Sequence, residues 1–249
     1  MILPVYKPLG ASTHLLAKKA GDIYQTKATH TGTLDPMANG VVIVLTNQDR
    51  FDKEKLSSWQ KQYQFEILWG IETDSHDLLG LTTAIDQNKY DQDKINTQIK
   101  LAIPQFTGVI QQQLPKFSAK RISGESYFDK AKREESFTPR SEEVQIHDLE
   151  LKRAYLISRS QLQQQLKNKI KLVTGDFRQE QILNNWQQVI PQLPDKLVVT
   201  RLLTTTSKRT YIRALVRDIA QQLQLPATTF SLTRTQNGEF SIRDCICLI

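Results

Sequence analysis

The chain has 249 residues, with 33 Lys and Arg against 26 Asp and Glu, so its formal net charge is +7. Hydrophobic residues make up 39% of the chain and charged residues 24%, which is ordinary for a soluble globular protein and excludes collagen, coiled-coil rods and wholesale disorder. No stretch approaches the ~20 apolar residues of a membrane helix, and the N-terminus lacks the pattern of a signal peptide. These features predict a cytoplasmic protein without membrane contact, and the excess positive charge favours an anionic partner such as nucleic acid.

Apolar periodicity predicts helices and strands that alternate irregularly along the chain. In chain order, we expect a helix over 13–24, strands over 41–45, 63–69, 144–151 and 197–203, and a helix over 212–223. Ser12 or Thr13 would cap the first helix. Because strands mix with helices without a regular βαβ rhythm, the pattern predicts an α+β fold with a mixed sheet.

Two segments differ in composition from the rest. Residues 104–140 carry seven Lys or Arg against four Asp or Glu, and residues 160–192 carry nine glutamines. We interpret the second segment as a polar helical insertion, solvated and peripheral to the scaffold. No flexible linker flanks it, so a single domain over 1–249 is expected. Cys245 and Cys247 are expected as small apolar residues of a terminal strand.

The most informative string runs from His30 to Gly40 and reads HTGTLDPMANG, directly before an apolar strand. Gly32, Pro36 and Gly40 are turn formers, and Pro36 biases the backbone of Asp35 away from the helical region. An isolated Asp-Pro pair would predict only a turn aspartate. The eleven-residue string is far more specific.

This string resembles the motif H-x-G-[TA]-L-D-P-x-A-x-G of the TruB family of tRNA pseudouridine synthases. Five further blocks follow the order of that family: KPLGAS from Lys7, KQY at 61–63 with TDSHDLLG at 73–80, FTG at 106–108 with FSA at 117–119, SKRTYIR at 207–213, and LTRT at 232–235 with GEF at 238–240. The resemblance therefore extends over nearly the whole chain.

The resemblance implies isomerisation of a uridine to pseudouridine, at uridine-55 in the T-loop of tRNA. The fold would be a mixed, mainly antiparallel central sheet flanked by helices and loops. The enzyme would need neither metal nor cofactor, and would act as a monomer on the T-arm of tRNA. Two alternatives stay open: a non-catalytic RNA-binding or tRNA-folding protein, and a pseudouridine synthase for another RNA.

The resemblance also implies roles for individual residues. Asp35 would be the catalytic carboxylate, either as a nucleophile or as the group that moves a proton from C2′. Arg213 would hold it ionised through an ion pair, and Tyr63 would stack on the uracil and help remove the C5 proton. Tyr211 would line the same pocket, and His30 would fill the space of the flipped base or stack in the loop. Periodicity alone would instead place Tyr63 in the core and Arg213 at the surface.

Further residues are expected to support the site. Lys7, Gly32, Pro36 and Gly40 would hold its structure, and Asp77 would bond RNA or position basic side chains. Asp77 and the nearby Asp74 could also suggest a divalent metal, but the sequence offers no further carboxylates to complete such a site.

RNA contacts outside the pocket are expected in 104–140, which would form an RNA-clamping loop. Lys116, Arg121 and Lys132 would bind phosphates there. Arg209 stands where the family usually has glycine, so a positive φ at that position would strain the turn. We also expect that no C-terminal RNA-binding module of the PUA type follows the last block.

Overall fold

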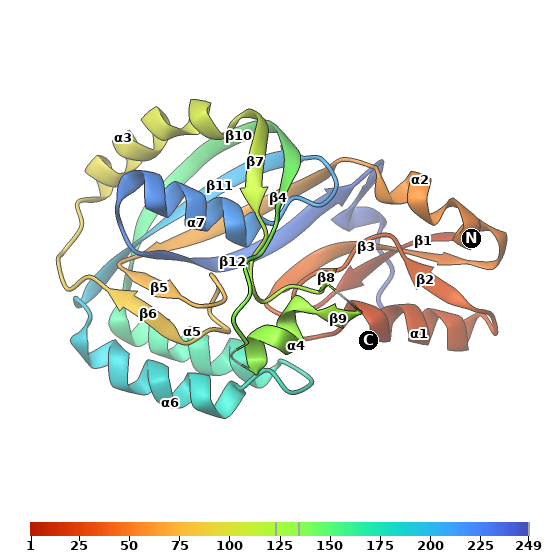
Figure 1. Ribbon diagram of the computed structural model, residues 1–249, viewed down its shortest axis with the longest axis horizontal. Coiled ribbons are helices and arrows are strands. Elements are labelled where there is room, and N and C mark those ends of the chain that lie inside the picture. Colours follow the sequence, from red (N-terminus) through yellow and green to blue (C-terminus); the bar gives the residue numbers. More distant parts are fainter. Residues whose placement is uncertain (123, 134, 249) are drawn as a thin grey trace.

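The computed structural model describes residues 1–122, 124–133 and 135–248 (Figure 1). Its helices are α1 (Thr13–Ile23), α2 (Lys53–Ser57), α3 (Gln92–Ala102), α4 (Tyr127–Lys132), α5 (Arg159–Lys171), α6 (Gln179–Val189) and α7 (Ile212–Leu223). Its strands are β1 (Ile2–Lys7), β2 (Ala28–His30), β3 (Ala38–Thr46), β4 (Lys61–Trp69), β5 (Ile71–Thr73), β6 (Thr82–Ile85), β7 (Gly108–Gln113), β8 (Arg121–Ile122), β9 (Glu125–Ser126), β10 (Ser141–Ser158), β11 (Lys196–Thr206), β12 (Ala227–Asn237) and β13 (Phe240–Ser241). Short 3-10 turns cover Asn47–Asp52, Ile103–Phe106, Ile190–Gln192 and Ile242–Asp244.

Within the described residues, a nine-stranded sheet has the order β1-β3-β12-β4-β11-β10-β7, with β2 on β3 and β13 on β12. All neighbouring strands in this sheet are antiparallel except β12 and β3, which run parallel. This arrangement confirms the predicted α+β fold with a mainly antiparallel central sheet. None of the described helices is long and apolar enough to cross a membrane.

Local periodicity predicted the main elements well. Both predicted helices and all four predicted strands are present. Ser12 caps α1 by accepting a hydrogen bond from the His14 amide. The β10 strand extends beyond the predicted residue 151 to Ser158. Its pairing with β11 has register irregularities between 146 and 148 and between 151 and 153, which shift the alternation of side chains, so periodicity alone did not predict where the strand ends.

Hydrophobic clusters cover both faces of the sheet. One cluster joins α1, α3 and α7 to one face, with Phe65, Ile67 and Trp69 of β4 fully buried in it. A smaller cluster under α2 packs against the opposite side of β3. Figure 1 shows α3 and α7 in front of the sheet and α5 and α6 side by side below it.

The 160–192 segment is helical, as predicted, but it is not merely solvated. Its apolar residues recur every fourth position along α5 and along α6 with the 3-10 turn that follows it, and they are buried: Leu162, Leu166, Ile170, Ile182, Trp186 and Ile190. They pack with Leu68, Leu78 and Val199 in a second core cluster. The many glutamines on the other helix faces masked this stripe in the sequence.

Two other expectations need correction. Cys245 follows the 3-10 turn Ile242–Asp244 and Cys247 is exposed, so neither lies in a terminal strand; Ile246 makes only an isolated bridge to Val5. The 104–140 segment is also not a loop throughout. It begins with a 3-10 turn, contributes β7 to the central sheet, and then forms the β8–β9 hairpin and α4.

The parallel contact between β12 and β3 depends on a glycine. Gly40 has φ +115°, and a Cβ atom there would lie 2.2 Å from the Arg234 carbonyl oxygen on the neighbouring strand. Gly108 has a similar φ of +101°, but a Cβ there would meet nothing within 4 Å. A side chain at Gly108 would therefore meet only backbone strain, whereas a side chain at Gly40 would meet both backbone strain and the close approach of β12.

We expect Gly40→Ala to lower the free energy of unfolding by more than about 4 kcal/mol, because it adds a clash with Arg234 to the backbone strain. Gly108→Ala is the matched control and should cost about 1 to 3 kcal/mol from strain alone. Urea denaturation of both variants measures the difference. Equal losses would show that the contact between β3 and β12 does not constrain position 40.

Candidate active site

The loop between β2 and β3 carries Asp35 and is fixed from several directions. The Thr13 hydroxyl bonds both backbone groups of Leu34, accepting from its N–H at 3.0 Å and donating to its carbonyl at 3.2 Å. The Gly10 amide donates to the Pro36 carbonyl at 2.8 Å, and the amide of Ala38 donates to the Asp35 carbonyl at 3.0 Å. The start of α1 therefore holds the residues on both sides of the carboxylate.

Two buried cations hold the ends of this loop. Arg234, only 2% exposed, donates from Nε to the Val41 carbonyl at 2.6 Å and from Nη2 to the Gly32 carbonyl at 3.3 Å. Lys7 is fully buried and donates from Nζ to the Ala38 carbonyl at 2.6 Å. Burial lowers the pKa of Lys7 to about 8, and the nearby Asp35 only partly opposes this effect. The expected supporting role of Lys7 thus has a geometric basis.

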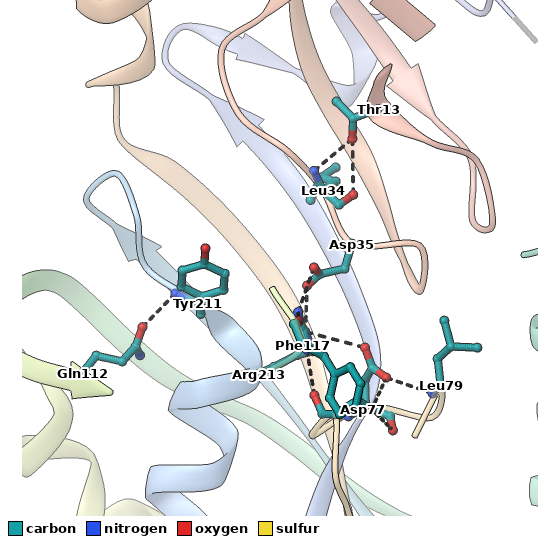
Figure 2. A network of polar contacts seen from close by, with 10 residues as sticks. Thr13, Leu34, Asp35, Asp77, Leu79, Gln112, Phe117, Tyr211 and Arg213 are labelled. Carbon is teal, nitrogen blue, oxygen red and sulfur yellow. Dashed lines mark hydrogen bonds and ion pairs between the residues drawn. The ribbon is translucent and has the colours of Figure 1, made fainter. Parts of the chain in front are cut away.

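The central contact of the site is a bidentate ion pair between Asp35 and Arg213 (Figure 2). Arg213 donates from Nε to Oδ2 at 2.8 Å and from Nη2 to Oδ1 at 2.9 Å. The side chain of Arg213 is 4% exposed, whereas that of Asp35 is 26% exposed. The pair therefore presents a carboxylate with a fixed orientation to solvent, while its counterion stays inside the protein.

The remaining donors of Arg213 also have buried partners. Nη1 donates to the Ser75 carbonyl at 2.7 Å, and Nη2 donates to the Phe117 carbonyl at 2.9 Å. Nε also lies 3.6 Å from Asp77 Oδ2, so the carboxylates of Asp35 and Asp77 both face the guanidinium (Figure 2). Burial acts against the charge, but the two carboxylates raise the pKa of Arg213 above its ordinary value. The arginine is thus a permanent cation.

Asp77 is oriented towards the protein interior. Its Oδ1 accepts hydrogen bonds from the Ser75 hydroxyl and the Leu79 amide, both at 2.8 Å. Burial raises the pKa of Asp77, and Arg213 opposes that rise. Asp74 instead pairs with Arg178 at 3.0 Å, so the two carboxylates that suggested a metal pair are engaged by different arginines.

Two hollows in the surface meet at Asp35. The larger, of about 750 Å³, is also lined by Tyr63 and Tyr211. The smaller, of about 420 Å³, is lined by His30 and Arg213 in addition to Asp35. The carboxylate therefore lies where a ligand in either cavity can reach it.

The two tyrosines reach the larger cavity from different elements. Tyr63 on β4 is 7% exposed, so it both packs in the core and contributes to the cavity wall. Tyr211 directly precedes α7, and its amide donates to Oε1 of Gln112 on β7 at 2.8 Å. Burial, followed by the charge of Asp35, raises the pKa of Tyr211. The structure thus brings both predicted aromatic residues to the cavity that contains Asp35.

The three basic residues expected to bind phosphate do not form one cluster. Lys132 on α4 forms an ion pair with Asp176, from the connection between α5 and α6. Arg121 is exposed and borders the smaller cavity, whereas Lys116 is exposed but borders neither hollow at Asp35.

Sequence reasoning missed three residues that hold the site: Thr13, Ser75 and Gln112. The signal for Thr13 was present, since two adjacent hydroxyl residues, Ser12 and Thr13, stand at the start of α1 and only one of them can cap it. Ser75 lies within the TDSHDLLG block, so its position also indicated a role. Gln112 is fully buried, but it is the middle member of a run of three glutamines and nothing in the sequence distinguishes it.

An aromatic cluster beside the smaller cavity was also missed. The Phe128 ring packs edge-on against Phe117 at 6.0 Å and Phe177 at 5.0 Å between ring centroids. The Arg178 guanidinium lies 4.4 Å from the centre of the Phe117 ring. These contacts join α4 to the start of α6, which lie far apart in the sequence.

His30 borders the smaller cavity, and its Nδ1 atom is buried without a hydrogen-bond partner among the described residues. Burial and the charges of Lys53 and Arg234 lower the pKa of His30 to about 4. The imidazole is therefore neutral at physiological pH and available for stacking or hydrogen bonding.

This lowered pKa predicts a pH-dependent stability. The unfolded chain binds a proton on His30 near pH 6.5 and the folded chain only near pH 4, so the free energy of unfolding falls as the pH falls across this interval. We expect His30→Asn to reduce the fall by up to about 3 kcal/mol in urea titrations between pH 4 and 7. The matched control is His147→Asn on β10, because His147 is not among the charged groups that act on His30, so the His30-dependent fall should remain. An unchanged slope in His30→Asn would contradict the assignment.

Comparison with known proteins agrees with this geometry. The chain is 28% identical to tRNA pseudouridine synthase B of Bacillus pumilus over 99% of its length and 68% of the relative's length. It is 29% identical to the enzymes of the same name from Treponema denticola, covering 98% of this chain and 61% of the relative, and Caldanaerobacter subterraneus, covering 99% and 72%. The chain thus spans about 60 to 70% of these curated relatives.

Solved structures support the same fold. A crystal structure of a Cbf5-Nop10-Gar1 complex matches with a TM-score of 0.59 and 19% identity over 99% of this chain and 52% of that chain. An H/ACA RNP bound to a substrate RNA containing 2′-deoxyuridine matches with a TM-score of 0.57 and 18% identity, over 99% and 50%. The family model described as TruB family pseudouridylate synthase (N terminal domain) matches residues 19–177. The chain therefore belongs to the TruB family of pseudouridylate synthases.

Proposed function

We propose that this protein isomerises a uridine of tRNA, uridine-55 in the T-loop, to pseudouridine. The observation that carries the proposal is the Asp35–Arg213 pair: an oriented, partly exposed carboxylate at the junction of two cavities, with a fully protonated arginine behind it. Family membership and the names of the similar tRNA pseudouridine synthases supply the reaction.

In this proposal, the target uridine leaves its stack in the T-loop and enters the larger cavity beside Asp35. Leaving the stack costs a few kcal/mol, which contacts with the pocket must offset. Tyr63 and Tyr211 provide aromatic surface for this purpose in the cavity wall. The neutral imidazole of His30 is suited to stacking in the RNA loop that the base has left.

Asp35 then starts the cleavage of the N-glycosidic bond in one of two ways. It acts as a nucleophile, and its covalent bond to the nucleoside breaks again once C5 has bonded to C1′, or it takes a proton from C2′ and returns that proton as C5 bonds to C1′. The bidentate contact with Arg213 fixes the direction of the carboxylate and stabilises its charge before the substrate arrives. After the uracil has turned and C5 has bonded to C1′, Tyr63 helps to remove the C5 proton. The residues in this scheme all belong to the protein, and no cofactor takes part.

Supporting residues act through Asp35 or through the RNA backbone. Asp77 positions Arg213 from the buried side, and Lys7 with the turn residues Gly32, Pro36 and Gly40 keeps the loop in place. The 104–140 segment clamps the RNA, with Arg121 closest to the cavities and Lys116 and Lys132 further out.

We expect Asp35→Asn to lower pseudouridine formation by at least about a thousandfold, because the amide can neither attack the nucleoside nor accept the proton. RNA binding should remain, since Arg213 keeps its contacts to Ser75 and Phe117. Carbodiimide-based mapping of tRNA after incubation with the purified protein measures both the activity and the modified position. Asp22→Asn, at an exposed position of α1, is the control. Retained turnover in Asp35→Asn would disprove the catalytic assignment.

We expect Tyr63→Phe to lower the turnover number by about a hundredfold, while the affinity for tRNA changes much less. The phenylalanine ring keeps the stacking surface and loses only the hydroxyl that would take part in proton removal. Single-turnover kinetics and filter binding separate the two quantities. Tyr24→Phe, at the end of α1 and 38% exposed, is the control for loss of a hydroxyl elsewhere. A wild-type rate would exclude the Tyr63 hydroxyl from the chemistry.

A further inference from the structure

The turn between β11 and α7 contains a residue in a conformation that favours glycine. Arg209 has φ +69°, in the left-handed region where a side chain is strained. From the sequence, we expected strain at Arg209 if its φ were positive, and φ is positive in the structure. Strained residues of this kind often persist at sites where the side chain binds something.

Arg209 borders the larger cavity together with other cations. Seven Lys or Arg side chains line this cavity against the two carboxylates of Asp35 and Glu54. Lys120 pairs with Glu142, and Lys61 and Arg234 donate to backbone carbonyls. The other four, at the outer part of the lining, make no ion pair within the described residues: Arg50, Lys53, Lys208 and Arg209.

The charges on this rim affect one another. Burial, together with the charges of Arg234 and Lys208, lowers the pKa of Lys61 to about 8. Because Asp35 is already neutralised by Arg213, the lining carries an excess of positive charge without an internal counterion. An anion that enters the cavity would relieve this repulsion.

An exposed aromatic ring borders the same cavity. Phe51, in the 3-10 turn Asn47–Asp52, is 78% exposed, the largest exposed fraction among the large apolar side chains of the described chain. The guanidinium of Arg50 lies 5.6 Å from the centre of its ring. Exposure costs free energy at a position where the chain could carry a polar residue, whereas a flat ring beside cations is the arrangement that binds unpaired nucleotides.

We propose that Arg209, Lys208 and Phe51 form a second RNA subsite at the mouth of the larger cavity. Arg209 and Lys208 bind backbone phosphates, and Phe51 stacks on a base next to the uridine that enters the cavity. The subsite rests on the proposed function, because it receives the nucleotides that flank the target. It favours RNA over a free phosphate, since a lone anion gains nothing from the aromatic ring.

The experiment measures the tRNA affinity of variants of the protein as a function of salt concentration. Arg209→Gln removes the charge and keeps the side-chain length, whereas Arg209→Gly also removes the strain and Arg209→Lys keeps the charge. Removing one phosphate contact should reduce the slope of log K against log salt by about 0.7 to 0.9. We expect this reduction in the Gln and Gly variants, with affinity lowered about threefold to tenfold at low salt, and a near wild-type slope in the Lys variant.

Two further variants serve as controls. Lys100→Gln removes an exposed cation from α3, which does not border the cavity, and should leave the slope unchanged. Gln224→Gly relieves a positive φ of +55° at the end of α7 without changing the charge. Thermal unfolding should show that neither Arg209→Gly nor Gln224→Gly is less stable than the wild type, so that weaker binding by Arg209→Gly cannot be attributed to unfolding.

Phe51→Ala tests the stacking component separately. It should weaken binding of tRNA and of a short single-stranded RNA about threefold to tenfold with an unchanged salt slope, because no charge is lost. In modification assays, both Arg209→Gln and Phe51→Ala should raise KM more than they lower kcat. Inorganic phosphate, titrated as a competitor of tRNA, should bind more weakly to Arg209→Gln than to the wild type. Its binding to Phe51→Ala should be unchanged.

A wild-type slope in Arg209→Gln and Arg209→Gly, or wild-type RNA affinity and KM in Phe51→Ala, would overturn the subsite while leaving pseudouridine formation, and hence the proposed function, intact. An equal loss of slope in Lys100→Gln would also overturn it, because the effect would then be general electrostatics. If the wild-type protein formed no pseudouridine but Arg209→Gln and Phe51→Ala still altered RNA binding as expected, the proposed function would fail and the subsite would stand.

Discussion

The buried guanidinium of Arg213 is the constraint on which the site depends. A cation that is 4% exposed needs partners, and it takes four of them from three separate segments: Asp35, Ser75 with Asp77, and Phe117. Each partner lies in a connection between the named helices and strands. The arginine, fixed at the first turn of α7, thus ties these stretches to the rigid sheet and positions the carboxylate.

Electrostatic balance is arranged in layers around this pair. The pair is nearly neutral, with Arg213 buried and Asp35 partly exposed, and the loop behind it is held by Lys7 and Arg234 through carbonyl groups. Four cations of the larger cavity make no ion pair within the described part of the chain. Asp35 thus has its counterion in Arg213, while the cations of the larger cavity remain able to attract a polyanion. The oriented carboxylate of Asp35 and the cations suited to bind a polyanion are thereby different groups of the same cavity.

Much of the fold could be read from local sequence, because side-chain periodicity is a local property. The helix over 212–223 and the strand over 63–69 were predicted within two residues of their bounds. Periodicity failed where the decisive contact is distant: it placed Arg213 at the surface, since its partner Asp35 lies 178 residues away. The motif resemblance predicted that pair. Gln112, with neither periodicity nor motif to mark it, could only be found in the structure.

The parallel register of β12 with β3 has a consequence for biosynthesis. Arg234 holds a backbone carbonyl 193 residues before it, so the loop of Asp35 cannot take its final form until the chain has been synthesised through β12. A nascent chain would carry the complete HTGTLDPMANG string early, yet lack both its ion-pair partner and its β-sheet neighbour. The string therefore acquires its ion-pair partner and its neighbouring strand only after α7 and β12 have been synthesised.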